Sequence, residues 1–201
     1  EVKAGQWEFH QLWVNDERRQ RCRYPKKGYV KVDKAPDAIE SDWRKGQNRF
    51  QFFPGDLKAW QELDRGEAIV LTRWVESRLP IAGIDEANRI ISFRNRSTYR
   101  IDPGNSSSSA AGLYYLENVR AFLTDPGEWF LDNKSGQLYY LPLPGEKIDR
   151  TQVIAPFLSK LVNFNADWQK GKFVEYLSFE NLTFNHTEWY FEKNFKPVGI
   201  P

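Results

Sequence analysis

Carboxyl groups are the most numerous side chains that could carry acid–base chemistry, with 27 Asp and Glu residues against two His and one Cys. Cleavage of a glycosidic bond by such groups needs two carboxyls at a fixed separation, one of them protonated near neutral pH. Glu128 and Asp132 draw attention because an aromatic run joins them. On one extended strand they would lie about 13 Å apart, too far for either hydrolytic geometry. We therefore expect Glu128 to accept hydrogen bonds from backbone or Arg groups and Asp132 to open a turn.

No other constellation of reactive side chains is visible in the sequence. His10 and His186 are far apart along the chain, and neither belongs to a cluster with the spacing of metal ligands. Cys22 is the single cysteine, and we interpret it as a small buried apolar residue. Gly112 and Gly127 are isolated and do not form a phosphate-binding loop. The sequence predicts no catalytic residue, no metal and no cofactor in this chain.

A basic stretch and a high tryptophan content suggest binding rather than catalysis. Positions 17–31 hold seven Lys and Arg residues and one acid. On a strand, Arg19, Arg21 and Arg23 would share one face because successive side chains alternate. Such a stripe can bind an anionic polymer, or it can be a solvated face in which one or two arginines clamp carboxylates of the fold. Of the eight tryptophans, Trp43 and Trp168 have the fewest apolar neighbours, and we expect them to be the exposed sugar platforms.

The elements that must position these residues are short strands. Residues 114–144 predict a hairpin with arms at Glu128–Asp132 and 137–141, joined by a Gly-containing turn. Residues 7–25 predict a second hairpin that turns at Asn15 and Asp16. Further strands are expected at Arg49–Phe52, 67–74, 77–85 and 89–93. The spacing of Leu57 and Trp60 predicts a short helix over 56–60.

The composition and the pattern of short strands separated by turns together predict a mainly β protein. Short strands with turns between them indicate an antiparallel, sandwich-like domain over residues 1–150. From 151 onward, two apolar alternations, Leu177/Phe179 and Leu182/Phe184, flank a bend in the way that is typical of a β-helix corner. No apolar run approaches the ~20 residues that a membrane-spanning helix needs. The net charge of +2 is too small to predict nucleic-acid binding.

Three segments, in order, resemble bacterial right-handed parallel β-helix glycoside hydrolases. The first is Leu-Trp-Val-Asn at 12–15 followed by an arginine-rich return to Tyr-Pro at 24–25, with Asp16 and Cys22 replacing the usual Gly and Ala. The second is Asp-Pro-Gly-Glu-Trp-Phe-Leu-Asp at 125–132 followed by Leu-Tyr-Tyr-Leu-Pro at 138–142. The third is the run 177–189, which resembles the first full rung of the helix. The resemblance implies that residues 151–201 begin a right-handed parallel β-helix.

The resemblance also implies where the chemistry lies. In that family the catalytic acids are on later rungs, so this chain is expected to stop before them. His186, Glu188 and Trp189 follow the rung at the point where the family's chain approaches the substrate groove. They are the predicted substrate-binding residues. The competing interpretation is that the aromatic run beginning at Trp189 only caps the helix.

These observations predict the N-terminal, non-catalytic part of a secreted or periplasmic bacterial glycoside hydrolase that acts on polysaccharide. Its expected partner is a polysaccharide or oligosaccharide, with no nucleic acid and no membrane insertion. It would be a monomer or continue into further rungs. The first alternative is a stand-alone carbohydrate-binding module that uses Trp43, Trp168 or Trp189 with the arginine stripe. The second is a structural β-domain that covers one end of a β-helix.

Overall fold

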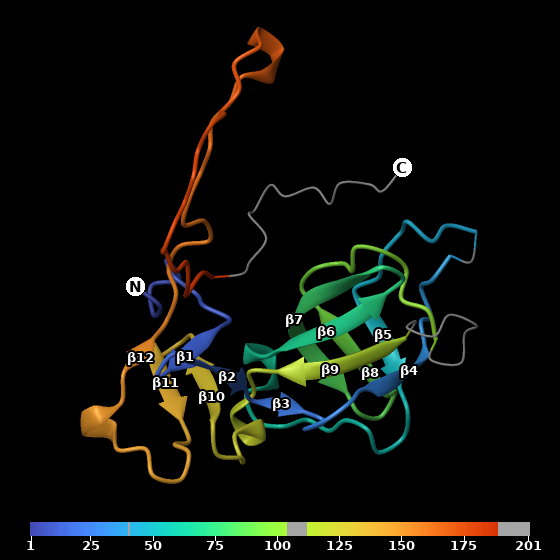
Figure 1. Ribbon diagram of the computed structural model, residues 1–201. Helices are drawn as coiled ribbons and strands as arrows, with labels where there is room; N and C mark the ends of the chain where they lie inside the picture. The colour runs from blue at the N-terminus through green and yellow to red at the C-terminus, as the bar shows by residue number, and fades with distance from the viewer. Residues whose placement is uncertain (40, 104–111, 189–201) are drawn as a thin grey trace.

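The computed structural model describes residues 1–39, 41–103 and 112–188 (Figure 1). Strands and short 3-10 segments make up its regular structure. The strands are β1 (Leu12–Val14), β2 (Glu17–Arg21), β3 (Arg23–Tyr24), β4 (Val30–Lys34), β5 (Arg49–Phe52), β6 (Glu67–Thr72), β7 (Val75–Asp85), β8 (Ile90–Phe93), β9 (Leu113–Glu117), β10 (Glu128–Asp132), β11 (Gln137–Tyr140) and β12 (Val153–Ile154). The 3-10 segments are η1 (Leu63–Arg65), η2 (Arg120–Phe122), η3 (Ile148–Arg150) and η4 (Trp168–Lys170). The mainly β prediction is confirmed.

Six antiparallel strands close into a barrel in the order β9-β4-β5-β8-β7-β6, and β6 pairs back to β9. β3 pairs with the same edge of β9 as β4 does. The prediction of a sandwich-like layer is corrected here, because two features let the sheet close. β9 is paired along both edges, and the eleven-residue β7 pairs first with β6 and then with β8 across an irregularity near Gly83. A strand that bends at such a point can serve two neighbours and turn a corner.

A five-stranded sheet in the order β11-β10-β2-β1-β12 lies beside the barrel (Figure 1). Both predicted hairpins are present in it. β10 and β11 pair antiparallel as expected. Asn15 and Asp16 connect β1 to β2 with φ angles of 51° and 61°, which Asx residues tolerate better than most. β10 also pairs in parallel with β2, which places the hairpin at the centre of the fold.

Strand β10 supplies side chains to two separate cores. All five of its residues are buried. Phe130 packs in the barrel core with Phe50 and Tyr114, whereas its neighbours Trp129 and Leu131 pack in the sheet core. Alternation along one strand therefore joins the two units by apolar burial.

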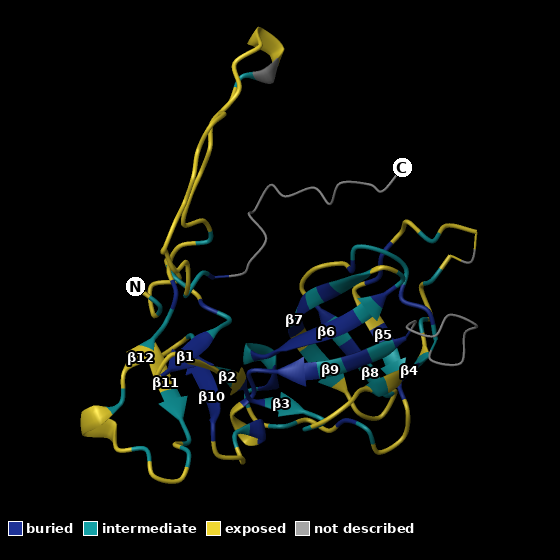
Figure 2. Ribbon diagram, viewed as in Figure 1, coloured by how far each residue is buried: buried dark blue, intermediate teal, exposed yellow. Residues whose placement is uncertain are grey.

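One other prediction of secondary structure is wrong. The helix expected over residues 56–60 is irregular chain, because Trp60 packs on the rings of Tyr24 and Phe122 at centroid distances of 5.0 and 5.1 Å. Beyond β12, the described residues run outward to η4 and back as two adjacent stretches (Figure 1). They form no stacked coil by themselves, and their apolar side chains are largely exposed (Figure 2). A single rung has no neighbour against which to bury its inner face. No helix in the described part of the chain is long and apolar enough to span a bilayer.

Candidate functional site

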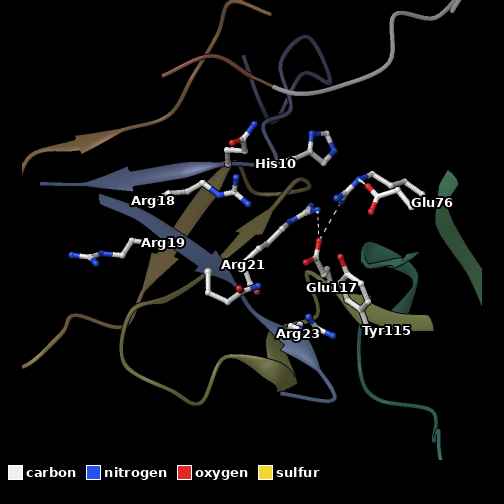
Figure 3. Close-up of a pocket in the computed structure, with 11 residues that line it drawn as sticks. His10, Arg18, Arg19, Arg21, Arg23, Glu76, Tyr115 and Glu117 are labelled. Atoms are coloured by element: carbon white, nitrogen blue, oxygen red, sulfur yellow. Dashed lines mark hydrogen bonds and ion pairs between the residues drawn. The ribbon is translucent and has the colours of Figure 1, made fainter. Parts of the chain in front are cut away.

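Two arginines and two glutamates meet where the barrel touches the five-stranded sheet. Figure 3 shows two of them, Arg21 and Glu117. Glu67 at the start of β6 and Glu117 at the end of β9 are register partners on adjacent strands. Arg21 of β2 hydrogen-bonds to Glu67 and lies 3.8 Å from Glu117. The Nη1 atom of Arg78 lies 3.7 Å from Glu67 and 3.3 Å from Glu117. We call Arg21, Glu67, Arg78 and Glu117 the charge quartet.

The quartet moves the pKa values of its two carboxyls in opposite directions. Burial raises the pKa of Glu117, and the nearby Arg21 and Arg78 oppose this only in part. Burial acts in the same way on Glu67, but Arg21, His10 and Arg78 together outweigh it and lower the pKa of that carboxyl. Two neighbouring acids with divergent pKa values are typical of an acid–base pair. Here, however, two guanidinium groups bind both carboxyls. The side chains of Glu67 and Glu117 are only 11% and 9% exposed. The arrangement joins barrel to sheet and leaves no room for a sugar between the acids.

A cleft of about 470 Å³ opens beside the quartet. It lies within the range of about 300–1,000 Å³ that is usual for small-molecule sites. Its lining residues come from both units and are rich in arginine. They are His10, Gln11, Arg18, Arg19, Gln20, Arg21, Arg23, Glu76, Arg78, Tyr115 and Glu117. The predicted stripe Arg19, Arg21 and Arg23 is therefore part of one concave surface.

The arginines of the stripe have different partners. Arg19 pairs with Glu17 and Glu146 at 2.6 and 2.7 Å, and Arg21 belongs to the charge quartet. The guanidinium of Arg23 lies 3.8 Å from the ring centroid of Tyr115. Among the described residues, it donates hydrogen bonds only to the carbonyls of Pro25 and Gly28. The prediction that one or two arginines clamp carboxylates is confirmed for Arg19 and Arg21.

The carboxyls predicted to be structural are structural. Glu128 accepts hydrogen bonds from Lys26 at 2.6 Å and from the backbone N–H groups of Thr124 and Asp125, each at 3.1 Å. Its cationic partner is thus Lys rather than Arg. Asp132 opens the turn by accepting from the backbone of Lys134 and from the hydroxyl of Ser135. These bonds lower the pKa of Asp132 although burial opposes them.

The residues predicted to bind substrate are only partly brought together. Glu188 is 4% exposed and accepts a hydrogen bond from the backbone N–H of His10 at 3.0 Å. Its other oxygen lies 3.3 Å from the His10 Nδ1. His186 packs edge-on against Trp13 at 5.1 Å and lies 3.4 Å from Asp16. Trp189 lies outside the described residues. A substrate-binding role for these residues stays a prediction.

The two predicted sugar platforms differ in surroundings. Trp43 is half-buried and packs against Trp74 and Tyr99 at 5.5 and 5.3 Å. Trp74, at the β6–β7 turn, is 64% exposed, and sequence reasoning did not single it out. Trp168 begins η4, and its side chain lies outside the described part of the chain.

Sequence reasoning also missed Glu67, Arg78, Tyr115 and Glu117. A usable signal was present for the two acids, because each sits at the end of a strongly apolar strand, beside Ala-Ile-Val-Leu and Tyr-Tyr-Leu. A carboxylate in that position is buried with the strand and needs a cationic partner. Within the described ranges, no group of three or more His, Cys, Asp or Glu side chains is placed to hold a metal ion.

A barrel and a sheet, joined by an ion-paired cluster and one shared hairpin, define an all-β module. The chain belongs to the GH141 insertion domain family, which matches residues 1–143. A solved structure named "Glycoside hydrolase" has the same fold over 90% of this chain, with a TM-score of 0.61 and 23% identity. This chain corresponds to 32% of that protein, about a third of its length. No curated protein matches the sequence. The predicted relation to glycoside hydrolases is thereby confirmed at the level of the insertion domain.

Proposed function

We propose that this chain is the non-catalytic insertion module of a secreted or periplasmic bacterial glycoside hydrolase that acts on polysaccharide. The module contributes structure and a wall of the substrate groove, while the acid–base pair belongs to another part of the parent enzyme. The observation that carries the proposal is the charge quartet. Its two carboxyls, Glu67 and Glu117, are neighbours with divergent pKa values, and Arg21 and Arg78 pair with both of them.

The proposal includes a parallel β-helix that begins in residues 151–188. Tyr176, Asn181 and His186 all have φ between 56° and 59°, so a corner-forming residue recurs at every fifth position. Apolar side chains stand one and three places after the first two of these corners, as in Leu177 and Phe179. Their exposure, 57% and 52%, supports an inner face that awaits a neighbouring rung.

The absence of catalysis is tested directly on the isolated chain. We expect no release of reducing ends from neutral or acidic polysaccharides above a buffer blank. Glu67→Gln and Glu117→Gln provide matched controls, because each removes one quartet charge at nearly constant volume. Turnover that either substitution abolishes would overturn the proposal and make the quartet an active site.

The β-helix and the export of the parent enzyme have separate tests. In the full-length protein, amides of residues 174–186 should exchange more slowly with solvent than in this chain alone, because rung packing protects them. Equal, fast exchange in both would contradict the β-helix. Fractionated source cells should hold the parent enzyme in the periplasm or the medium, and a strictly cytoplasmic location would contradict export.

A second candidate function, carbohydrate binding by the barrel, is favoured by one observation. Trp43, Trp74 and Tyr99 form an aromatic cluster, and Trp74 presents 64% of its surface. A large exposed indole offers a flat apolar face to a pyranose ring. Affinity electrophoresis in neutral polysaccharide should retard the wild type and not Trp74→Ala. Equal mobility of the two proteins would remove this candidate.

A further inference from the structure

We propose that the arginine-lined cleft is a binding site for the carboxylates of an acidic oligosaccharide, with Arg18 and Arg23 as its charged ligands. The proposal names a ligand class for a site distinct from the aromatic cluster. The identification of a sugar as the carrier of the carboxylate rests on the proposed function, whereas the anion site rests on the structure alone.

Most of the charge that lines the cleft is already paired. Five arginines and two glutamates line it. Glu67, Glu17 and Glu146 do not line the cleft but pair with Arg21, Arg78 or Arg19, and they bring the carboxylates to five. Each of these five carboxylates forms an ion pair with Arg19, Arg21 or Arg78. The positive charge that faces an incoming ligand therefore belongs to Arg18 and Arg23.

Arg18 and Arg23 keep their charge available for a ligand in different ways. In the described part of the chain, neither of them has a carboxylate within ion-pair distance. Arg18 is exposed. Arg23 is held in place by two backbone carbonyls and by the ring of Tyr115. A guanidinium fixed by neutral groups keeps its charge for a ligand, and its fork matches a carboxylate in two parallel hydrogen bonds.

The cleft also offers groups that suit a sugar. Burial raises the pKa of Tyr115 to about 12, so its hydroxyl remains an O–H donor at neutral pH. Gln11 and Gln20 line the same cleft and add amide groups that can hydrogen-bond to ring hydroxyls. A small number of polar groups around a concave surface is typical of a site that fixes ligand orientation.

The test compares ligands that differ only in charge. Isothermal titration of the chain would use a trigalacturonate, its methyl ester, a neutral trigalactoside and sodium sulfate. We expect binding of the trigalacturonate alone, and weaker binding as salt is raised because Arg18 is exposed. Equal binding of the methyl ester would show that the carboxylate is not recognised and would overturn the proposal. Equal binding of sulfate would reduce the cleft to an adventitious anion site only. The proposal would also be overturned if none of the probes bound.

Three variants assign the residues. Arg18→Ala should weaken trigalacturonate binding roughly tenfold or more, the usual effect of losing one charge-assisted hydrogen bond. Arg23→Lys keeps the charge but loses the fork, and should also weaken binding. Arg150→Ala is the matched control, because Arg150 is exposed in η3 and does not line the cleft. Unchanged affinity in Arg18→Ala and Arg23→Lys, with folding verified by circular dichroism, would refute the assignment. The proposed function would fail differently, through turnover by the isolated chain.

Discussion

Replacing Arg21 by methionine should destabilise the protein by about 3–5 kcal/mol, the cost of breaking a buried ion pair by removing one partner. The side chain of Arg21 is 4% exposed, and its partners Glu67 and Glu117 are 11% and 9% exposed. Methionine fills much of the space but supplies no charge. Glu67 and Glu117 would then share Arg78 alone, at 3.7 and 3.3 Å. The contact between the barrel and the sheet would lose its central cation.

The pH dependence of this loss has a definite sign. In the wild type the folded-state pKa of Glu67 is lowered from its ordinary 4.5. Its stabilising contribution is therefore present above pH 4.5 and is lost as pH falls through the folded-state pKa. Without Arg21, burial dominates and raises the pKa of Glu67. The Arg21→Met variant should then regain stability as pH falls, so its deficit relative to the wild type should shrink between pH 7.5 and pH 5.

Urea unfolding followed by tryptophan fluorescence at both pH values measures the effect. Arg49→Met is the matched control, because Arg49 pairs in a bidentate manner with Asp37 at 2.5 and 2.9 Å but is 49% exposed. It should cost much less, since exposed pairs contribute little. The double variant Arg21→Met/Glu67→Gln should recover part of the loss. A deficit for Arg21→Met no larger than for Arg49→Met, or one that widens at pH 5, would refute the reasoning.

Three further predictions follow from single buried groups. Asn118→Ala should cost about 3 kcal/mol in urea unfolding, because Leu131 loses two hydrogen bonds, at 2.9 and 3.0 Å, and alanine must adopt φ of 57°. Asn118→Gly should cost about 1 kcal/mol less, and equal losses would contradict the role of backbone strain. Cys22 should resist a thiol reagent at pH 8 until urea is added, because burial raises its pKa to about 12; rapid native labelling would contradict its burial. Glu117→Gln should lack the gain in stability that the wild type shows as pH falls from neutral, since the raised pKa of Glu117 makes folding favour its protonated form; parallel pH profiles would contradict that direction.

Turn residues that are neighbours in sequence predicted the two hairpins. Closure of the barrel was not predictable, because it depends on pairing between strands that are far apart in sequence. The turn residues Asn15 and Asp16 lie next to each other, so their conformation follows from short-range chemistry. Closure of the barrel depends instead on β9 pairing with both β4 and β6, which no local pattern encodes. The helix expected near Trp60 was wrong for the same reason, because packing against Phe122 outweighs a weak local periodicity.

The same distinction holds for the site. The roles of Glu128 and Asp132 were predictable because many of their partners lie within four residues. The charge quartet was not, since Arg21 and Glu67 are 46 residues apart in sequence. What sequence did provide was the shared face of the arginine stripe, and only the fold assigned its members to different partners.

The arginine stripe shows how one short segment of chain, across β2 and β3, can serve two purposes. Arg19 and Arg21 are paired with carboxylates. Arg19 binds Glu146 beside the five-stranded sheet, and Arg21 joins that sheet to Glu67 of the barrel. Arg23, two residues further on, rests on Tyr115 of the barrel and keeps its charge. A ligand bound by Arg18 and Arg23 would therefore touch a group from each side of the junction that Arg21 closes. Binding should then stabilise the junction itself, because a ligand that prefers the folded state shifts unfolding to higher denaturant. Trigalacturonate should accordingly raise the urea midpoint of the wild type more than that of Arg18→Ala, and an equal rise in both would place the ligand elsewhere.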